Sequence, residues 1–167
     1  MVNATVPWYI QRVTNPGRDI SLLFDLFVVN QRVKRLVNEA LAGVSLRADE
    51  YAVYSLLWEQ SPLTATEMAR RMAMPLTTVL DYIAAMDKRG HLRRERHPRD
   101  GRAQHLSLTM AGVTEWRRTG KAWGVMSARL ERSLRKAGAA IRRSLHELDD
   151  AVAAILADYE LEAAAAK

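Results

Sequence analysis

A cluster of basic side chains lies between Lys88 and Arg102. This segment holds seven Lys or Arg residues and two acids, so its net charge of +5 is most of the chain's +6. Guanidinium and ammonium groups donate charge-assisted hydrogen bonds to phosphate oxygens, and the sequence pI near 10.0 points to a polyanionic partner. Because the charge is concentrated in one segment, it favours a nucleic acid over a membrane surface. A solvated basic loop is the alternative for a charge run taken alone.

The residues before this cluster predict two short helices joined by a tight turn. Thr64 to Glu67 has the S/T-x-x-E spacing of a capping box, which predicts a helix start. Pro75 ends that pattern and suits the first turn of a second helix, expected over 75–89. Gly90 is the expected stop of the second helix. Its apolar stripe follows the helical spacing i, i+3, i+4, i+7 and consists of Val79, Tyr82, Ile83 and Met86.

The segment after Gly90 predicts a hairpin with a basic tip. Two strands joined by a Pro/Asp-Gly turn fit the pattern best, with Leu106 and Leu108 facing inward. The short link Ser61–Leu63 is a candidate for a third small strand beside them. Two helices followed by such a hairpin predict a helix-turn-helix with a wing.

These motifs carry a family resemblance. The run from Met86 to Leu92, then Arg94, Asp100-x-Arg102 and Leu106-Ser107-Leu108-Thr109-x-x-Gly112, resembles the MarR family of transcription regulators. Met86 stands where that family usually has leucine, which keeps the position apolar. The resemblance covers nearly the whole chain. It implies a mainly α (α+β) fold, a winged helix-turn-helix with N- and C-terminal dimerisation helices, in a homodimer that regulates transcription.

The flanking segments predict the helices of such a dimer. An N-terminal arm precedes a long helix over 18–42, whose wide apolar arc needs two surfaces to bury it and which Gly43 should end. A helix over 46–58 follows, and further helices after Thr109 are separated by a weak break at Ala137-Gly138. The expected division is therefore 1–44 (arm and dimerisation helix), 45–109 (winged helix-turn-helix) and 110–167 (C-terminal dimerisation helices).

A dimer of this kind would bind double-stranded DNA through both subunits. The helix over 75–89 has the dimensions to lie in the major groove, and two-fold symmetry predicts a pseudo-palindromic operator. The resemblance implies that Arg102, with Asp100 as the group that would hold it, enters the adjacent minor groove. The predicted DNA-binding residues are Thr66, Thr77, Thr78, Asp81, Lys88, Arg94, Arg96, Arg99 and Arg102.

The recognition helix departs from the family pattern at Leu80-Asp81, where relatives usually have a polar residue followed by arginine. A carboxylate is repelled by phosphate, yet it can accept a hydrogen bond from cytosine N4, and a leucine can touch a thymine methyl. An intramolecular ion pair of Asp81 with Arg70, Arg71 or Arg89 is as good an interpretation as a base contact. A winged-helix interaction protein with weak or non-specific DNA binding is therefore the alternative function.

Regulators of the family it resembles often respond to a small molecule bound between the dimerisation helices and the DNA-binding part. Several aromatic side chains could line such a pocket for an aromatic or phenolic effector, and core packing is the alternative for each of them. The candidates are Phe27, Tyr51, Tyr54, Trp58, Trp116 and Trp123.

Other classes of function find little support in the residues. The absence of cysteine excludes disulfides and thiolate metal sites. The spacing of His91, His97 and His105 matches no common zinc motif, so no metal or cofactor is expected. His146 and Glu147 read as a solvated surface pair. No catalytic motif is recognisable, so an enzyme is not expected. No segment approaches the roughly 20 apolar residues of a membrane span, and a cytoplasmic location is expected.

Overall fold

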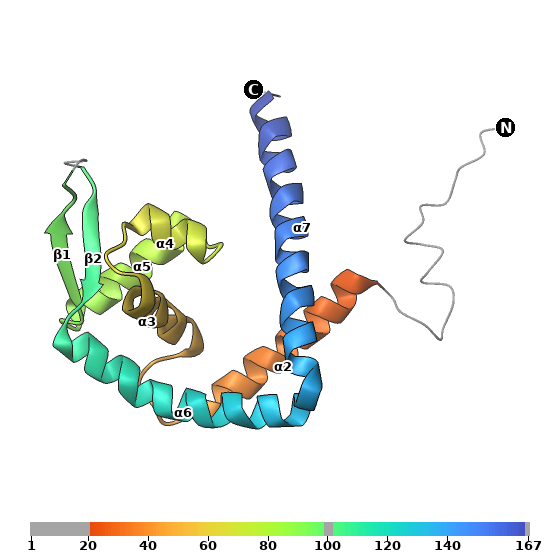
Figure 1. Cartoon of the computed structure of the whole chain (residues 1–167). Coiled ribbons are helices and arrows are strands. Elements are labelled where there is room, and N and C mark those ends of the chain that lie inside the picture. The colour runs from red at the N-terminus through yellow and green to blue at the C-terminus, as the bar shows by residue number, and fades with distance from the viewer. Residues whose placement is uncertain (1–20, 99–101, 166–167) are drawn as a thin grey trace. The chain divides into compact units, whose positions relative to one another are not determined.

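The computed structural model of the chain describes residues 21–98 and 102–165 (Figure 1). In chain order its elements are α2 (Leu22–Ala40), α3 (Ala48–Gln60), α4 (Ala65–Arg71), α5 (Leu76–Lys88), β1 (Leu92–Arg96), β2 (Gln104–Leu108), α6 (Met110–Leu134), the 3-10 turn η1 (Arg135–Ala137) and α7 (Gly138–Ala165). The predicted mainly helical fold with a small antiparallel sheet is confirmed. The chain forms two compact units, one ending at Gly124 and one beginning at Val125. The predicted three-part division stays a prediction, and the N-terminal arm lies outside the described residues.

The core of the first unit joins α3, α4, α5 and the hairpin. On α5 the predicted stripe faces this core, because Val79, Ile83 and Met86 are buried and Tyr82 is half-buried. Leu106 of β2 is buried and Leu108 packs against the same cluster, as the alternation predicted. The buried members of the cluster are Leu46, Tyr51, Val53, Tyr54, Leu57, Leu63, Met68, Val79, Ile83, Met86, Leu92 and Leu106.

Both predicted helix signals around the helix-turn-helix are confirmed. At the start of α4 the Thr64 hydroxyl accepts from the Glu67 N–H at 3.2 Å, and the Glu67 carboxylate accepts from the Thr64 N–H at 2.7 Å. At the end of α5, Gly90 has φ +69, and the N–H of His91 donates to the Met86 carbonyl at 3.0 Å. A residue without Cβ adopts that left-handed conformation without strain, so α5 stops at a defined residue.

The capping box makes the stability of α4 depend on pH. Hydrogen bonds from the Thr64 backbone and hydroxyl hold the pKa of Glu67 below its usual value. The stabilisation is therefore present above the pKa of the unfolded chain and is lost as pH falls through the folded pKa. We expect Glu67→Gln to destabilise the protein by about 0.5 to 1 kcal/mol at pH 6. This value is at the low end of the free energies that helix caps contribute, because solvent reaches the carboxylate.

Urea unfolding of both proteins at pH 6 and near pH 3 checks this expectation. The gap between wild type and Glu67→Gln should narrow at the lower pH, because a protonated glutamate resembles glutamine. Glu59→Gln, at an exposed position of α3, is the control. A gap of equal size at both pH values would show that the charge of Glu67 is unimportant.

The hairpin is the wing that the sequence predicted. Strands β1 and β2 pair antiparallel, with Leu92 opposite Leu108 and Arg96 opposite Gln104. The predicted third strand is a single antiparallel bridge, in which Leu63 and Leu106 exchange backbone hydrogen bonds of 3.2 and 2.8 Å. The bridge anchors the base of the wing to the segment before α4.

Two of the predicted helices have different boundaries in the structure. The helix expected from Arg18 begins at Leu22, because Ser21 has an extended backbone and its hydroxyl accepts from the Phe24 N–H at 3.1 Å. It ends at Ala40, before Gly43. The helix expected from Leu46 begins at Ala48, because the Glu50 carboxylate accepts from the N–H of Arg47 at 2.9 Å, which makes Arg47 the cap.

The terminal helices α2 and α7 each carry an apolar seam in which residues repeat alternately at four and three positions. Most of these side chains are exposed, and only Leu26 and Leu148 are half-buried. Such spacing is that of helices that pack along one another. Within the described residues, no helix is long and apolar enough to cross a bilayer. The seams are Leu22, Leu26, Val29, Val33 and Leu36 on α2, and Ile141, Leu145, Leu148, Val152 and Ile155 on α7.

Candidate nucleic-acid interface

Helices α4 and α5 pack against one another and against the β1–β2 hairpin (Figure 1). The opposite face of α5 carries exposed side chains. Thr77, Asp81 and Lys88 are exposed on this face, and Thr78 is half-buried. The buried stripe of Val79 and Ile83 fixes which face points outward, because a helix can present only one stripe to the core. The predicted DNA-binding residues of α5 are therefore accessible from solvent.

A cleft lies between the start of α4, the middle of α5 and the wing. It brings together three predicted site residues, Thr66, Arg94 and Arg102, which come from three different elements of the chain. The side chain of Leu80 on α5 also lines this cleft. The remaining lining residues are Thr64, Ala65, Ile83, Ala103, Gln104 and Leu106.

Arg94 is held in place at the edge of this cleft. Its Nη2 lies 3.1 Å from Oδ2 of Asp87, and its Nη1 donates to Oε1 of Gln104 at 3.0 Å. Both charged partners are partly exposed, so the pair contributes less than about 1 kcal/mol to folding. Its main consequence is to orient the guanidinium, whose remaining N–H groups can meet a phosphate.

The other basic residues of the wing and of the end of α5 form an exposed positive surface. Lys88 and Arg96 are exposed, and Arg93, which sequence reasoning did not single out, pairs with Glu95 at 3.2 Å. Arg99 and Asp100 lie outside the described residues, so their predicted roles stay predictions. An exposed ion pair is easily exchanged for a phosphate contact, because solvent and salt already weaken it.

Asp81 is exposed, and two of its three predicted ion-pair partners contact other side chains. Arg89 pairs with Glu50 at 2.7 Å, and the side chain of Arg71 donates to Gln60. In the part of the chain that the structure describes, Asp81 forms no ion pair with Arg70, Arg71 or Arg89. Its carboxylate therefore stays available to an outside partner, and the base contact stays a prediction.

A polar network joins α3 to the end of α5 and the start of the wing. The buried Tyr54 hydroxyl lies 2.8 Å from Nδ1 of His91, while Glu50 holds Arg89. Burial raises the pKa of Tyr54, and the hydrogen bond that Arg89 donates to the Glu50 carboxylate raises the pKa of Arg89. Sequence reasoning missed this network, since Tyr54 and His91 are 37 residues apart and no local pattern links them.

The aromatic side chains predicted to line an effector pocket pack in pairs between α3 and α6. The rings of Tyr51 and Trp123 lie 5.1 Å apart, and those of Trp58 and Trp116 stack at 4.6 Å. Tyr54 is buried, whereas Trp58 is 43% exposed. Phe27, on α2, is also exposed. Most of these rings therefore hold α3 against α6, and their effector role stays a prediction.

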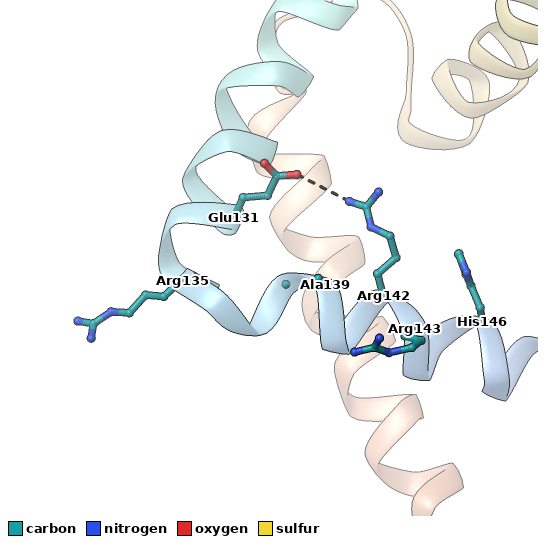
Figure 2. Close-up of a pocket in the computed structure, with 7 residues that line it drawn as sticks. Glu131, Arg135, Ala139, Arg142, Arg143 and His146 are labelled. Atoms are coloured by element: carbon teal, nitrogen blue, oxygen red, sulfur yellow. Dashed lines mark ion pairs between the residues drawn. The ribbon is translucent and has the colours of Figure 1, made fainter.

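The second unit has a shallow basic pocket at the bend between α6 and α7 (Figure 2). Arg142 reaches toward Glu131 at 3.9 Å, and Arg135, with φ +51, points away from the pocket. His146 lines the same pocket. In residues 21–98 and 102–165, no group of three or more His, Cys, Asp or Glu residues is arranged to hold a metal ion.

The fold and the exposed face of α5 together define a winged helix-turn-helix, a class in which the second helix of the motif enters the major groove. The sequence model of the MarR family matches residues 46–103, which span α3 to the wing. The HTH-type transcriptional regulator TtmR of Methylorubrum extorquens (strain PA1) is 28% identical over 94 residues, 56% of this chain and 48% of TtmR. The chain thus matches about half the length of this curated relative.

Three solved structures are similar over most of the described chain. A probable transcriptional regulator from Pseudomonas aeruginosa is 27% identical with a TM-score of 0.69, over 77% of this chain and 96% of that one. The PcaV regulator of Streptomyces coelicolor, solved with its natural ligand, is 23% identical with a TM-score of 0.68, over 84% and 95%. MepR of S. aureus, solved with DNA, is 13% identical with a TM-score of 0.70, over 80% and 99%.

Residues 46–103 thus match the MarR family of transcription regulators, and the resemblance seen in the sequence is confirmed over the helix-turn-helix and the first strand of the wing. The fold of the chain is the winged-helix fold of that family.

Proposed function

We propose that this chain is a repressor that acts as a homodimer on a pseudo-palindromic operator and is released by a small aromatic or phenolic effector. Its role is binding rather than catalysis. The proposal adds to the family assignment the oligomeric state, the sign of regulation and the kind of effector.

The cleft between α4, α5 and the wing carries the proposal for DNA binding. Arg94 and Arg102 line it beside Thr66, and the exposed face of α5 adjoins it through Leu80. A major-groove helix flanked by cations that reach the sugar-phosphate backbone is the arrangement that positions a reader on duplex DNA. The structure of MepR with DNA supports this use of the fold.

The apolar seams of α2 and α7 support the homodimer. Most of their leucine, valine and isoleucine side chains are exposed to water. Packing against a second copy of the chain would bury these side chains. A two-fold dimer places its two α5 helices about 34 Å apart, so each reads one half of the operator.

The effector proposal rests on the aromatic side chains of α2 and α3 that stay accessible. Phe27 and Trp58 are 58% and 43% exposed, and apolar rings of this kind stack on aromatic ligands. The PcaV structure contains its natural ligand, which supports a small-molecule partner for this fold. A thermal-shift screen of phenolic and aromatic acids against the dimer identifies candidates.

A second function, a winged-helix interaction protein with weak DNA binding, is favoured by one observation. Within the described residues of α5, Lys88 in the last turn is the only cation, and Asp81 presents a negative charge on the outer face. Unselective binding that salt abolishes would support this function over the repressor.

Replacing the wing arginine tests the proposed DNA binding directly. We expect Arg102→Ala to weaken operator binding by about tenfold and to reduce the slope of log affinity against log salt by about 1, because one cation that neutralises the DNA at the minor groove is lost. Gel-shift titrations at several salt concentrations measure both quantities. Arg143→Ala removes the same charge from α7 and is the control. Equal affinity of Arg102→Ala and wild type would rule out the proposed wing contact.

A further inference from the structure

The outer face of α5 presents leucine where a DNA reader commonly presents a polar or basic side chain. Leu76 and Leu80 are 43% and 47% exposed, one turn apart at the start and middle of the helix. Each leucine is followed directly by an exposed polar residue, Thr77 or Asp81. The core takes its apolar side chains from the opposite stripe, so packing within the described unit does not require leucine at either position.

The position of the two leucines suits a contact with bases better than a contact with phosphate. In a helix-turn-helix the N-terminal part of the second helix meets the base edges in the major groove. Leu76 is the first residue of α5, and Leu80 lines the cleft that Arg94 and Arg102 share. Cations beside Leu80, and the exposed apolar surface that Leu76 and Leu80 form, suit one occupant, the major groove of duplex DNA.

An apolar side chain in the major groove has one complementary feature to meet. The 5-methyl group of thymine is the apolar group that base pairs of ordinary DNA present there, and cytosine carries a methyl at the same position when it is methylated. A carboxylate next to the leucines repels phosphate and can accept from the amino group of cytosine, which suits the exposed Asp81.

We infer that Leu76 and Leu80 are the specificity-determining residues of α5 and that they recognise the 5-methyl groups of pyrimidines in the operator. The inference rests on the proposed operator binding and names what the recognition helix reads. It follows that 5-methylcytosine at a contacted position offers the leucine the same methyl group as thymine.

Uracil differs from thymine only by the missing methyl, so it tests the inference without changing base pairing. An operator is first selected from a random duplex library, and each thymine is then replaced by deoxyuridine in turn. Burial of one methyl changes affinity by about fourfold. We expect losses of about this size at the contacted thymines, measured by fluorescence anisotropy.

Leucine variants assign the losses to side chains. In Leu80→Ala the penalty for uracil should vanish at the position that Leu80 contacts and persist at the position of Leu76, and Leu76→Ala should show the reverse. Circular dichroism and thermal unfolding establish that both variants fold, which is expected because both side chains are exposed. The unmodified operator, which carries thymine at the same position, is the control for duplex quality.

The outcomes separate this inference from the proposed function. Penalties at particular thymines that disappear in one leucine variant support the inference. Selective operator binding that is insensitive to uracil, or uracil penalties that persist in both variants, overturns the inference and leaves the repressor proposal intact. Failure to select any preferred sequence overturns both.

Discussion

Gly112→Ala is expected to destabilise the protein by about 1 to 3 kcal/mol or more, because the added methyl has no room. A Cβ at this position would overlap the backbone carbonyl oxygen of His91 and lie 3.3 Å from its carbonyl carbon. A backbone group cannot rotate away as a side chain can, so α6 or the start of the wing must shift.

Hydrogen bonds of Thr109 hold the backbone of Gly112 close to the backbone of His91. The Thr109 hydroxyl accepts from the Gly112 N–H at 3.2 Å and donates to the Gly90 carbonyl at 2.8 Å, and the Thr109 N–H donates to the His91 carbonyl at 3.0 Å. The end of the wing, the start of α6 and the turn after α5 are therefore fastened at one point. The Thr-x-x-Gly motif thus has a structural explanation.

Gly124→Ala in the same helix is the matched control for this prediction. A Cβ at Gly124 meets nothing within 4 Å, so alanine there should stabilise α6 by about 0.5 to 1 kcal/mol through its higher helix propensity. Urea unfolding monitored by circular dichroism measures both changes. Equal stabilities of the two variants would contradict the close packing at Gly112.

If the proposed homodimer forms through α7, Val152→Glu is expected to convert it to monomers and to weaken operator binding by about 100-fold or more. Val152 lies in the apolar seam of α7, and burying a carboxylate in a helix interface costs more than the interface gains there. A monomer binds a single half-site and loses the effective concentration that links the two halves of the operator.

Ala154→Glu adds the same charge to an exposed position of α7 outside the seam, and it should leave the dimer intact. Light scattering after size-exclusion chromatography reports the mass, and gel shifts of the same fractions report affinity. A dimeric Val152→Glu would exclude the α7 seam from the interface, whereas loss of the dimer in both variants would reflect charge alone.

Much of the winged helix-turn-helix could be predicted from the sequence because its signals are local. The capping box at Thr64, the stripe that buries Val79 and Ile83 and the stop at Gly90 each depend on residues within two turns of one another. Backbone hydrogen bonding and helical period decide such features before any tertiary contact forms. The starts of α2 and α3 were harder to predict from the sequence. Ser21 and Arg47 each cap one helix, but the apolar pattern continues beyond these boundaries.

The sequence by itself determined the fold class, the family resemblance and the basic wing, whereas the tertiary structure decided which side chains meet. It placed Arg94 between Asp87 and Gln104, joined Tyr54 to His91, and grouped Thr66 with Arg102 in one cleft. It also showed Leu76 and Leu80 on an exposed face and most aromatic candidates paired between α3 and α6. The physical reason is distance along the chain: local hydrogen bonding fixes each element, but contacts between elements depend on how the shared core packs them together.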